Sequence, residues 1–162
     1  MSLSRVKLLY SHLPPEKVAH IKVLLGRSRR AVASLMISEF LMARQTDTVG
    51  AVLGKIRKDS RKRLAIYCVY LVDDRDALVG VATIRQLLAA VPETIISSIM
   101  RRKVIRVKED TPIKRLAEIF YKYEFTAVPV VDKQNRILGI VTIKTAYESA
   151  LGRGRGGGEE IT

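Results

Sequence analysis

Two stretches of the chain show the same succession of apolar and polar positions. Each opens with apolar residues three, four and seven positions apart, the spacing of one face of an α-helix. These residues are Val49, Val52, Leu53 and Ile56 in one stretch, and Leu116, Ile119, Phe120 and Tyr123 in the other. Each helical segment leads into two β-branched apolar runs, 66–72 with 78–84 and 126–131 with 137–143, which predict buried strands. Short helices are expected at 85–90 and 144–151, and short strands near 41–44 and 104–107.

The strand pairs of the two stretches are copies of one sequence. Residues 68–84 match residues 127–143 without a gap at a shift of 59, which pairs Gly80 with Gly139. An internal repeat of this size predicts two similar units that bury their apolar faces against each other.

The helices upstream follow the repeat at another shift. Matching letters align them at a shift of 63, with Thr48 opposite Thr111. Each threonine is expected to cap its helix, because a hydroxyl there can accept from an amide that the first turn leaves free, and Pro112 suits the first helical position. The change of shift predicts a four-residue insertion near 58–63, in a surface loop.

The repeat divides the chain into four parts. Residues 1–34 are expected to form an N-terminal helical segment, 35–97 the first unit, 98–151 the second unit, and 152–162 a flexible, glycine-rich tail. The predicted fold class is mixed α/β (α+β). Each unit is a small, mostly three-stranded sheet with two helices, and a pseudo-twofold axis relates the two units.

The net charge of the chain indicates which kinds of partner it could bind. The chain holds 29 Lys and Arg against 16 Asp and Glu, a net charge of +13, and the basic surplus is concentrated in residues 1–63. A surplus of this kind indicates nucleic acid, anionic lipid, nucleotide phosphates or an acidic protein face as partner, or simply a solvated surface.

Other features limit the compartment and the chemistry. No run reaches the roughly 18 to 20 apolar residues that a membrane-spanning helix needs, and no secretory signal opens the chain. The single cysteine, Cys68, suits a reducing cytoplasm. His12 and His20 lack a zinc or haem spacing, and neither a nucleophile elbow nor a phosphate-binding P-loop is present. We therefore expect a cytoplasmic protein that is not an enzyme.

The ordered pattern resembles tandem cystathionine-β-synthase (CBS) domains, whose pairs are called Bateman modules. The resemblance rests on a Thr-capped helix, a strand ending in VPVVD, and a GIVT segment leading into a helix, and it covers about residues 35–151. Segments such as LPPEKVAHIKVLL, SLMISEF and DRDALVGVATIRQLL are similar to the cytoplasmic part of MgtE-type magnesium transporters. The resemblance implies a regulatory module that binds an adenine nucleotide (ATP, ADP or AMP) or another anion between the copies. It also implies a homodimer and an attached membrane transporter.

The resemblance also implies which residues would contact the ligand. Thr83 and Thr142 stand where the family contacts phosphate or ribose, although capping of a helix would explain them equally. Gln86 and Thr145 stand where nucleotide-binding members have the Asp that holds the ribose hydroxyls, so adenosine affinity is expected to be weakened or changed in kind. The other candidates could meet phosphate or surround the base: Arg85, Lys144, Cys68, Tyr70, Phe125, Ala127, Val128 and Pro129.

Two other functions stay open. One is a basic nucleic-acid-associated protein with a structural CBS core, whose binding would fall steeply with salt. The other is a ligand-free dimerisation module. MgtE-type proteins sense magnesium through acidic faces, and a chain of net charge +13 lacks that surplus of carboxylates, which argues against magnesium sensing by this chain alone.

Overall fold

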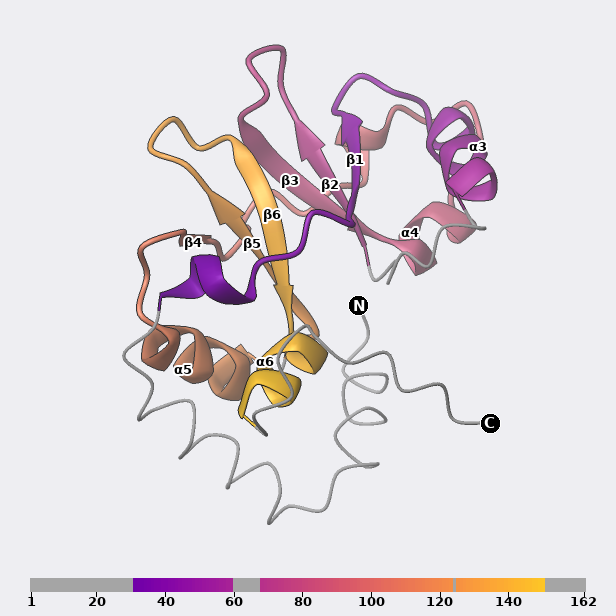
Figure 1. The fold of residues 1–162 in the computed structure, drawn as a ribbon. Coiled ribbons are helices and arrows are strands. Elements are labelled where there is room, and N and C mark those ends of the chain that lie inside the picture. Colours follow the sequence, from indigo (N-terminus) through magenta and orange to yellow (C-terminus); the bar gives the residue numbers. More distant parts are fainter. Residues whose placement is uncertain (1–30, 60–67, 124, 151–162) are drawn as a thin grey trace, which may run out of the picture.

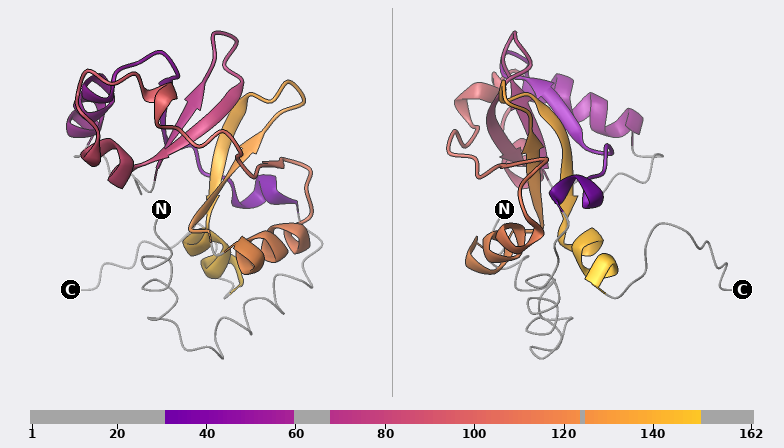
Figure 2. Two further views of the ribbon diagram at one scale, coloured as in Figure 1. Left: turned by 180° about the vertical axis from the view of Figure 1, so that it is seen from behind. Right: turned by 60° about the vertical axis from the view of Figure 1, so that its left-hand side comes forward.

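The computed structural model describes residues 31–59, 68–123 and 125–150 and contains two copies of one α/β unit (Figure 1). The first copy consists of β1 Leu41–Arg44, α3 Val49–Asp59, β2 Cys68–Val72, β3 Leu78–Thr83 and α4 Ile84–Ala89. The second consists of β4 Val107–Lys108, α5 Ile113–Tyr123, β5 Ala127–Val131, β6 Ile137–Thr142 and α6 Ile143–Ala150. Helices α3 and α4 lie toward one end of the molecule and α5 and α6 toward the other (Figures 1 and 2).

Both sheets have the same topology. The strand orders are β1-β2-β3 and β4-β5-β6, with a parallel first pair and an antiparallel second pair. The antiparallel pairs shift register at equivalent places, between Leu71 and Val72 and between Val130 and Val131. The predicted fold class, two mostly three-stranded units in a mixed α/β protein, is therefore confirmed.

The hairpin turns of the two copies are built alike. The Asp73 carboxylate accepts hydrogen bonds from the amides of Arg75 and Ala77, at 2.9 and 3.0 Å. Asp132, 59 residues later, accepts from the amides of two equivalent residues, both at 2.9 Å. A carboxylate that closes a turn in this way explains why the repeat contains an aspartate at the end of each strand.

The register of the two helices differs from the sequence alignment by one residue. In the strand-to-helix turns, the amide of Arg44 donates to Asp47 and the amide of Lys108 donates to Thr111, both at 3.0 Å. Asp47 is therefore equivalent to Thr111, at a shift of 64, and the predicted pairing of Thr48 with Thr111 is wrong. Aspartate and threonine both supply the acceptor that the turn needs. An alignment based on identical residues therefore did not show which positions of the two helices are equivalent.

The helix caps differ accordingly. The amide of Ala51 donates to the Thr48 hydroxyl at 3.2 Å, so Thr48 caps α3 as predicted. The Thr111 hydroxyl is occupied by the turn instead, and α5 begins at Ile113, after Pro112. The predictions of Thr111 as a cap and of Pro112 as the first helical residue are therefore wrong. With a shift of 64, the insertion in the first copy is five residues rather than four.

Each copy is completed by the segment that precedes the other copy. The short helix η1 Val32–Leu35 buries Val32 and Leu35 in the core of the second copy, with Leu116 and Val128. The short helix η2 Ile96–Ser98, 64 residues later, buries Ile96 in the core of the first copy. Isolated bridges join the copies in equivalent pairs: Val81 with Arg101 and Ile37 with Ile140, and Thr48 with Ile95 and Ala31 with Pro112. These pairs give the fold its pseudo-twofold symmetry.

The two sheets meet in a shared apolar layer. Tyr70 and Leu78 of the first copy pack with Val131 and Ile140 of the second, and all four are at most 3% exposed. Burying such side chains stabilises the pair by roughly 1.5–3 kcal/mol for each large residue, so neither copy would be stable with this face in water.

Some predicted segments differ from the structure or lie outside it. The strand expected near 104–107 is β4 at Val107–Lys108, because residues 104–106 cross to the first copy, where Arg106 Nη1 donates to the Leu78 carbonyl at 3.1 Å. Most of the predicted N-terminal helical segment (1–34) and all of the tail (152–162) lie outside the described residues. Among the described helices, none has the length and apolar character to span a bilayer.

Candidate functional site

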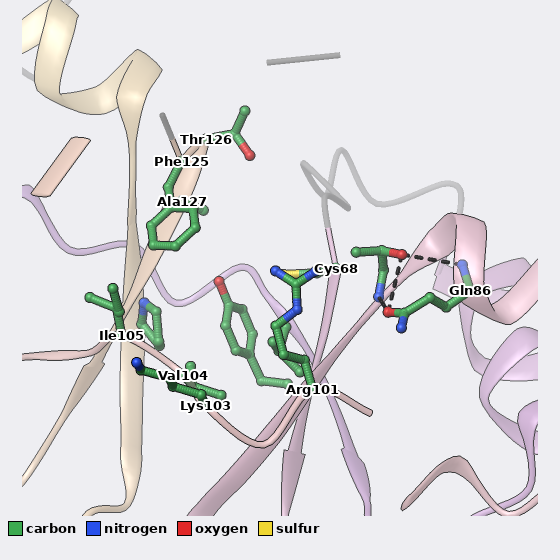
Figure 3. Close-up of a pocket in the computed structure, with 13 residues that line it drawn as sticks. Cys68, Gln86, Arg101, Lys103, Val104, Ile105, Phe125, Thr126 and Ala127 are labelled. Atoms are coloured by element: carbon green, nitrogen blue, oxygen red, sulfur yellow. Dashed lines mark hydrogen bonds between the residues drawn. The ribbon is translucent and has the colours of Figure 1, made fainter. Parts of the chain in front are cut away.

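A pocket opens where the connecting segment of the chain crosses between the copies (Figure 3). Five groups of residues form its wall. They are Cys68 and Tyr70 of β2, Val81 and Thr83 of β3, Gln86 of α4, Arg101, Lys103, Val104 and Ile105 of the connecting segment, and Phe125, Thr126, Ala127 and Pro129 at β5. The pocket therefore draws on both copies, and its shape depends on how they sit against each other.

The wall of the pocket suits a ligand with an apolar part, because most of it is apolar. Pockets that bind small ligands generally combine apolar walls with a few polar groups. Phe125 stacks on Tyr123 at 5.5 Å between ring centroids and 13° between planes, which fixes one aromatic wall.

The end of the pocket at β3 and α4 is closed by a helix cap. The Thr83 hydroxyl accepts from the Gln86 amide at 3.2 Å, and the Gln86 side-chain carbonyl accepts from the Thr83 amide at 2.9 Å. The Thr83 hydroxyl also donates to that carbonyl at 3.2 Å. The remaining polar group, Nε2 of Gln86, donates to the Ile99 carbonyl at 2.9 Å. This reciprocal arrangement is a capping box, which holds the start of α4 against the strand.

Cys68 and Tyr70 form a neutral pair on the strand wall. Burial raises the pKa of the Cys68 thiol to about 11 and raises the pKa of the Tyr70 hydroxyl well above its ordinary value. The proximity of the two side chains contributes to both shifts. Because the charged forms are disfavoured by desolvation, both groups carry their protons at neutral pH and add no negative charge to the pocket.

The connecting segment supplies the positive charge. Arg101 and Lys103 are both exposed, and the Arg101 side chain extends toward the space between Phe125 and Gln86 (Figure 3). The backbone of Arg101 is held by two hydrogen bonds to Val81, at 2.8 and 3.0 Å. No described residue forms a side-chain hydrogen bond or ion pair with Arg101 or Lys103. Two cations beside an apolar pocket favour an anion with an apolar body.

Seven of the twelve predicted site residues line this pocket, and the structure thereby brings both strand walls and the first helix cap together. They are Cys68, Tyr70, Thr83, Gln86, Phe125, Ala127 and Pro129. The other five do not line it. They are Arg85, Val128, Thr142, Lys144 and Thr145. Arg85 is exposed, whereas Val128 is fully buried and packs in the core of the second copy.

Thr142, Lys144 and Thr145 lie at the equivalent junction of the second copy. Thr142 is only 3% exposed; its hydroxyl hydrogen-bonds to the Thr145 hydroxyl at 2.8 Å and accepts from the Thr145 amide at 3.0 Å. The Lys144 side chain is largely exposed, and its Nζ lies 3.9 Å from Oε1 of Glu148 on the same helix. Both threonines therefore act in capping α6.

The prediction from sequence missed the residues of the connecting segment, above all Arg101 and Lys103. A signal was available, since Met100 aligns with Met36 at a shift of 64 and the basic run RRK follows directly. Between two units related by a twofold axis, the linking segment must cross their interface, so charges on it lie beside any ligand there. Within the described ranges, no group of three or more His, Cys, Asp or Glu side chains could hold a metal ion.

Two tandem units with a pocket between them match a known family. The model of the CBS domain matches residues 32–93 and, a second time, residues 96–151. The chain belongs to the CBS-domain family. The two matched ranges begin at the short helices η1 and η2, and the tandem CBS pair that the resemblance implied is confirmed.

Magnesium transporters are among the relatives of this CBS pair. The magnesium transporter MgtE of Thermus thermophilus is 35% identical over 131 residues, which is 81% of this chain and 29% of the transporter. The chain thus spans less than a third of that relative's length. The crystal structure of the cytosolic domain of the Mg²⁺ channel MgtE in complex with ATP shares 34% identity and a TM-score of 0.71. The match covers 81% of this chain and 53% of that one.

A CBS pair of another protein is also similar in structure. Its crystal structure contains 5′-methylthioadenosine and S-adenosyl-L-methionine, with 27% identity and a TM-score of 0.63. The match covers 76% of this chain and 97% of that one. CBS pairs of this shape thus include ones solved with adenosine compounds.

Proposed function

We propose that this chain is a regulatory, non-catalytic module that binds an adenine nucleotide in the pocket between its two copies. The observation that carries the proposal is the pair of unpartnered cations, Arg101 and Lys103, at the mouth of an apolar pocket with an aromatic wall. An adenine ring matches the apolar wall, and phosphates match the cations. The similar structures solved with ATP and with adenosine compounds support this choice of ligand.

Binding at this place would act on the arrangement of the copies. Thr83 and Gln86 belong to the first copy, Phe125 and Pro129 belong to the second, and Arg101 lies on the segment between them. A ligand that touches all three parts favours the geometry in which they fit it, and it shifts the population toward that geometry. We propose that an attached transporter of the MgtE type reads this shift at the cytoplasmic face of a membrane, with the CBS pair acting as a homodimer.

Calorimetric titration of the 162-residue chain with ATP, ADP and AMP tests the proposal. The double variant Arg101→Ala/Lys103→Ala should weaken the binding of ATP by about tenfold or more, since it removes two charge-assisted contacts. The matched control is Arg85→Ala/Lys144→Ala, which removes the same charge from exposed positions outside the pocket. This control should change the affinity by about twofold or less at physiological salt.

The two variants separate a local site from a general effect of charge. Equal weakening by both would show that ATP responds to the net charge of the chain rather than to the pocket. Absence of binding by all three nucleotides to the unmodified chain would overturn the proposal.

A further inference from the structure

The acceptor lone pairs of the Gln86 side chain are already used within the protein. The amide and the hydroxyl of Thr83 both donate to it. The charged side chains, Arg101 and Lys103, have no partner among the described residues. The charge that the pocket offers to a ligand is therefore concentrated in two cations.

Gln86 shows the consequence most directly. A carbonyl oxygen has two lone pairs, and Oε1 of Gln86 accepts from both the amide and the hydroxyl of Thr83. Its Nε2 donates to the Ile99 carbonyl at 2.9 Å. A pair of neighbouring sugar hydroxyls needs two acceptors side by side, as a carboxylate offers them. Gln86 has no acceptor left to offer.

We propose that the pocket does not read the hydroxyls of the ligand's sugar and selects its ligand by ring and phosphate alone. This inference rests on the proposed function, since it concerns the nucleotide bound in the same pocket. An acceptor whose lone pairs are already used gains nothing from a sugar hydroxyl, because accepting the new bond would break an existing one. Removing both sugar hydroxyls therefore leaves the affinity almost unchanged.

The test compares ATP with 2′,3′-dideoxy-ATP, two probes of equal charge that differ in these hydroxyls alone. In calorimetric titrations of the unmodified chain without magnesium, the two dissociation constants should agree within about threefold. Weaker binding of the dideoxy compound by more than about threefold overturns the inference while leaving the proposed function intact. If neither compound binds, the proposed function fails and the inference fails with it.

A substitution identifies the residue responsible. Gln86→Asp supplies a carboxylate with free lone pairs and should raise the preference for ATP over the dideoxy compound to about tenfold. The matched control is Thr145→Asp, the same change at the equivalent position of the second copy, which should leave the ratio unchanged. A folded Gln86→Asp protein, verified by circular dichroism, that shows no gain in preference would exclude Gln86 as the determinant of sugar specificity.

Discussion

The interface between the copies has two equivalent strand-to-helix junctions that share a backbone and differ in side chains. At the first junction, Thr83 accepts from an amide three residues later at 3.2 Å, and at the second, Thr142 does so at 3.0 Å. The crossing segments are equivalent too, since Arg101 pairs with Val81 as Ile37 pairs with Ile140. The backbone alone therefore does not distinguish the two junctions as ligand sites.

The side chains of the crossing segments do distinguish them. Arg101 and Lys103 stand beside the first junction, and the residues 64 positions earlier, beside the second, are Ile37 and Glu39. A carboxylate in place of an ammonium group repels phosphate instead of attracting it. The comparison teaches that the helix-capping motif supports the fold at both junctions, and that the segments crossing the interface give the two junctions different charges.

The largest expected effect concerns the thiol of Cys68 in the first copy. The equivalent residue in the second copy is Ala127, which has no thiol. Burial raises the pKa of Cys68 from an ordinary 9.0 to about 11. Because only the thiolate reacts, alkylation by iodoacetamide near pH 8 should be about 100-fold slower in the folded chain than in the chain unfolded by urea. Mass spectrometry measures this rate without ambiguity, since Cys68 is the single cysteine.

The raised pKa also fixes how the alkylation rate of Cys68 should change with pH. A raised pKa keeps the thiol neutral to higher pH, so the rate for the folded chain should climb about tenfold per pH unit through pH 9. A plateau near pH 9 would mean that the Cys68 thiol ionises as if it were exposed to water.

The next effect concerns the two glycines at which the crossing segments approach the sheets. A Cβ at Gly139 would lie 2.6 Å from the Ile37 carbonyl oxygen and 2.5 Å from Cγ of Met36. Gly139→Ala should therefore destabilise the protein by about 1–3 kcal/mol, because a main-chain atom has to move. Urea denaturation followed by circular dichroism measures this free energy of unfolding.

The equivalent substitution, Gly80→Ala, serves as the comparison. Its Cβ would lie 2.5 Å from Sδ of Met100 and 3.2 Å from the nearest main-chain oxygen, that of Arg101. A methionine side chain adapts more readily than a backbone, so this variant should lose less stability. A larger loss for Gly80→Ala than for Gly139→Ala would contradict the difference between the two crossings.

The smallest effect concerns charge at the second junction. Glu39 does not line the pocket, so Glu39→Lys should change the dissociation constant for ATP by about twofold or less at physiological salt. The reverse substitution at the equivalent position, Lys103→Glu, should weaken binding by about tenfold or more, because it places a negative charge beside the phosphates. Comparable effects of the two substitutions, measured by calorimetry, would remove the distinction between the junctions.

Much of the fold could be predicted from the sequence because local physics governs it. The β-branched runs predicted the main strands to within one or two residues, as with 126–131 and the observed β5 Ala127–Val131. The shift of 59 placed Gly80 opposite Gly139, and their shared close contacts with Met100 and Met36 agree with it. The predicted alignment of the two helices was wrong by one residue, because Asp47 and Thr111 accept the same hydrogen bond in the turn although they are different residue types.

The candidate site was predictable only in part. The residues on the strands and at the first helix cap could be found because each lies within the repeated motif, as Cys68 and Thr83 do. Arg85 and Lys144 lie two residues after the capping threonines, at exposed positions that do not line the pocket. Arg101 and Lys103 follow the aligned Met100, but only the crossing of the connecting segment between the copies brings them to the pocket.

The sequence by itself determined that the chain holds two copies of one unit, since periodic apolar positions and turn residues act over short distances. Only the tertiary structure decided that the segment before each copy completes the other, and that one crossing segment brings Arg101 and Lys103 to a shared pocket. The reason is physical. Which face of one sheet covers the other depends on burying their joint apolar surface, a long-range requirement that no local pattern encodes.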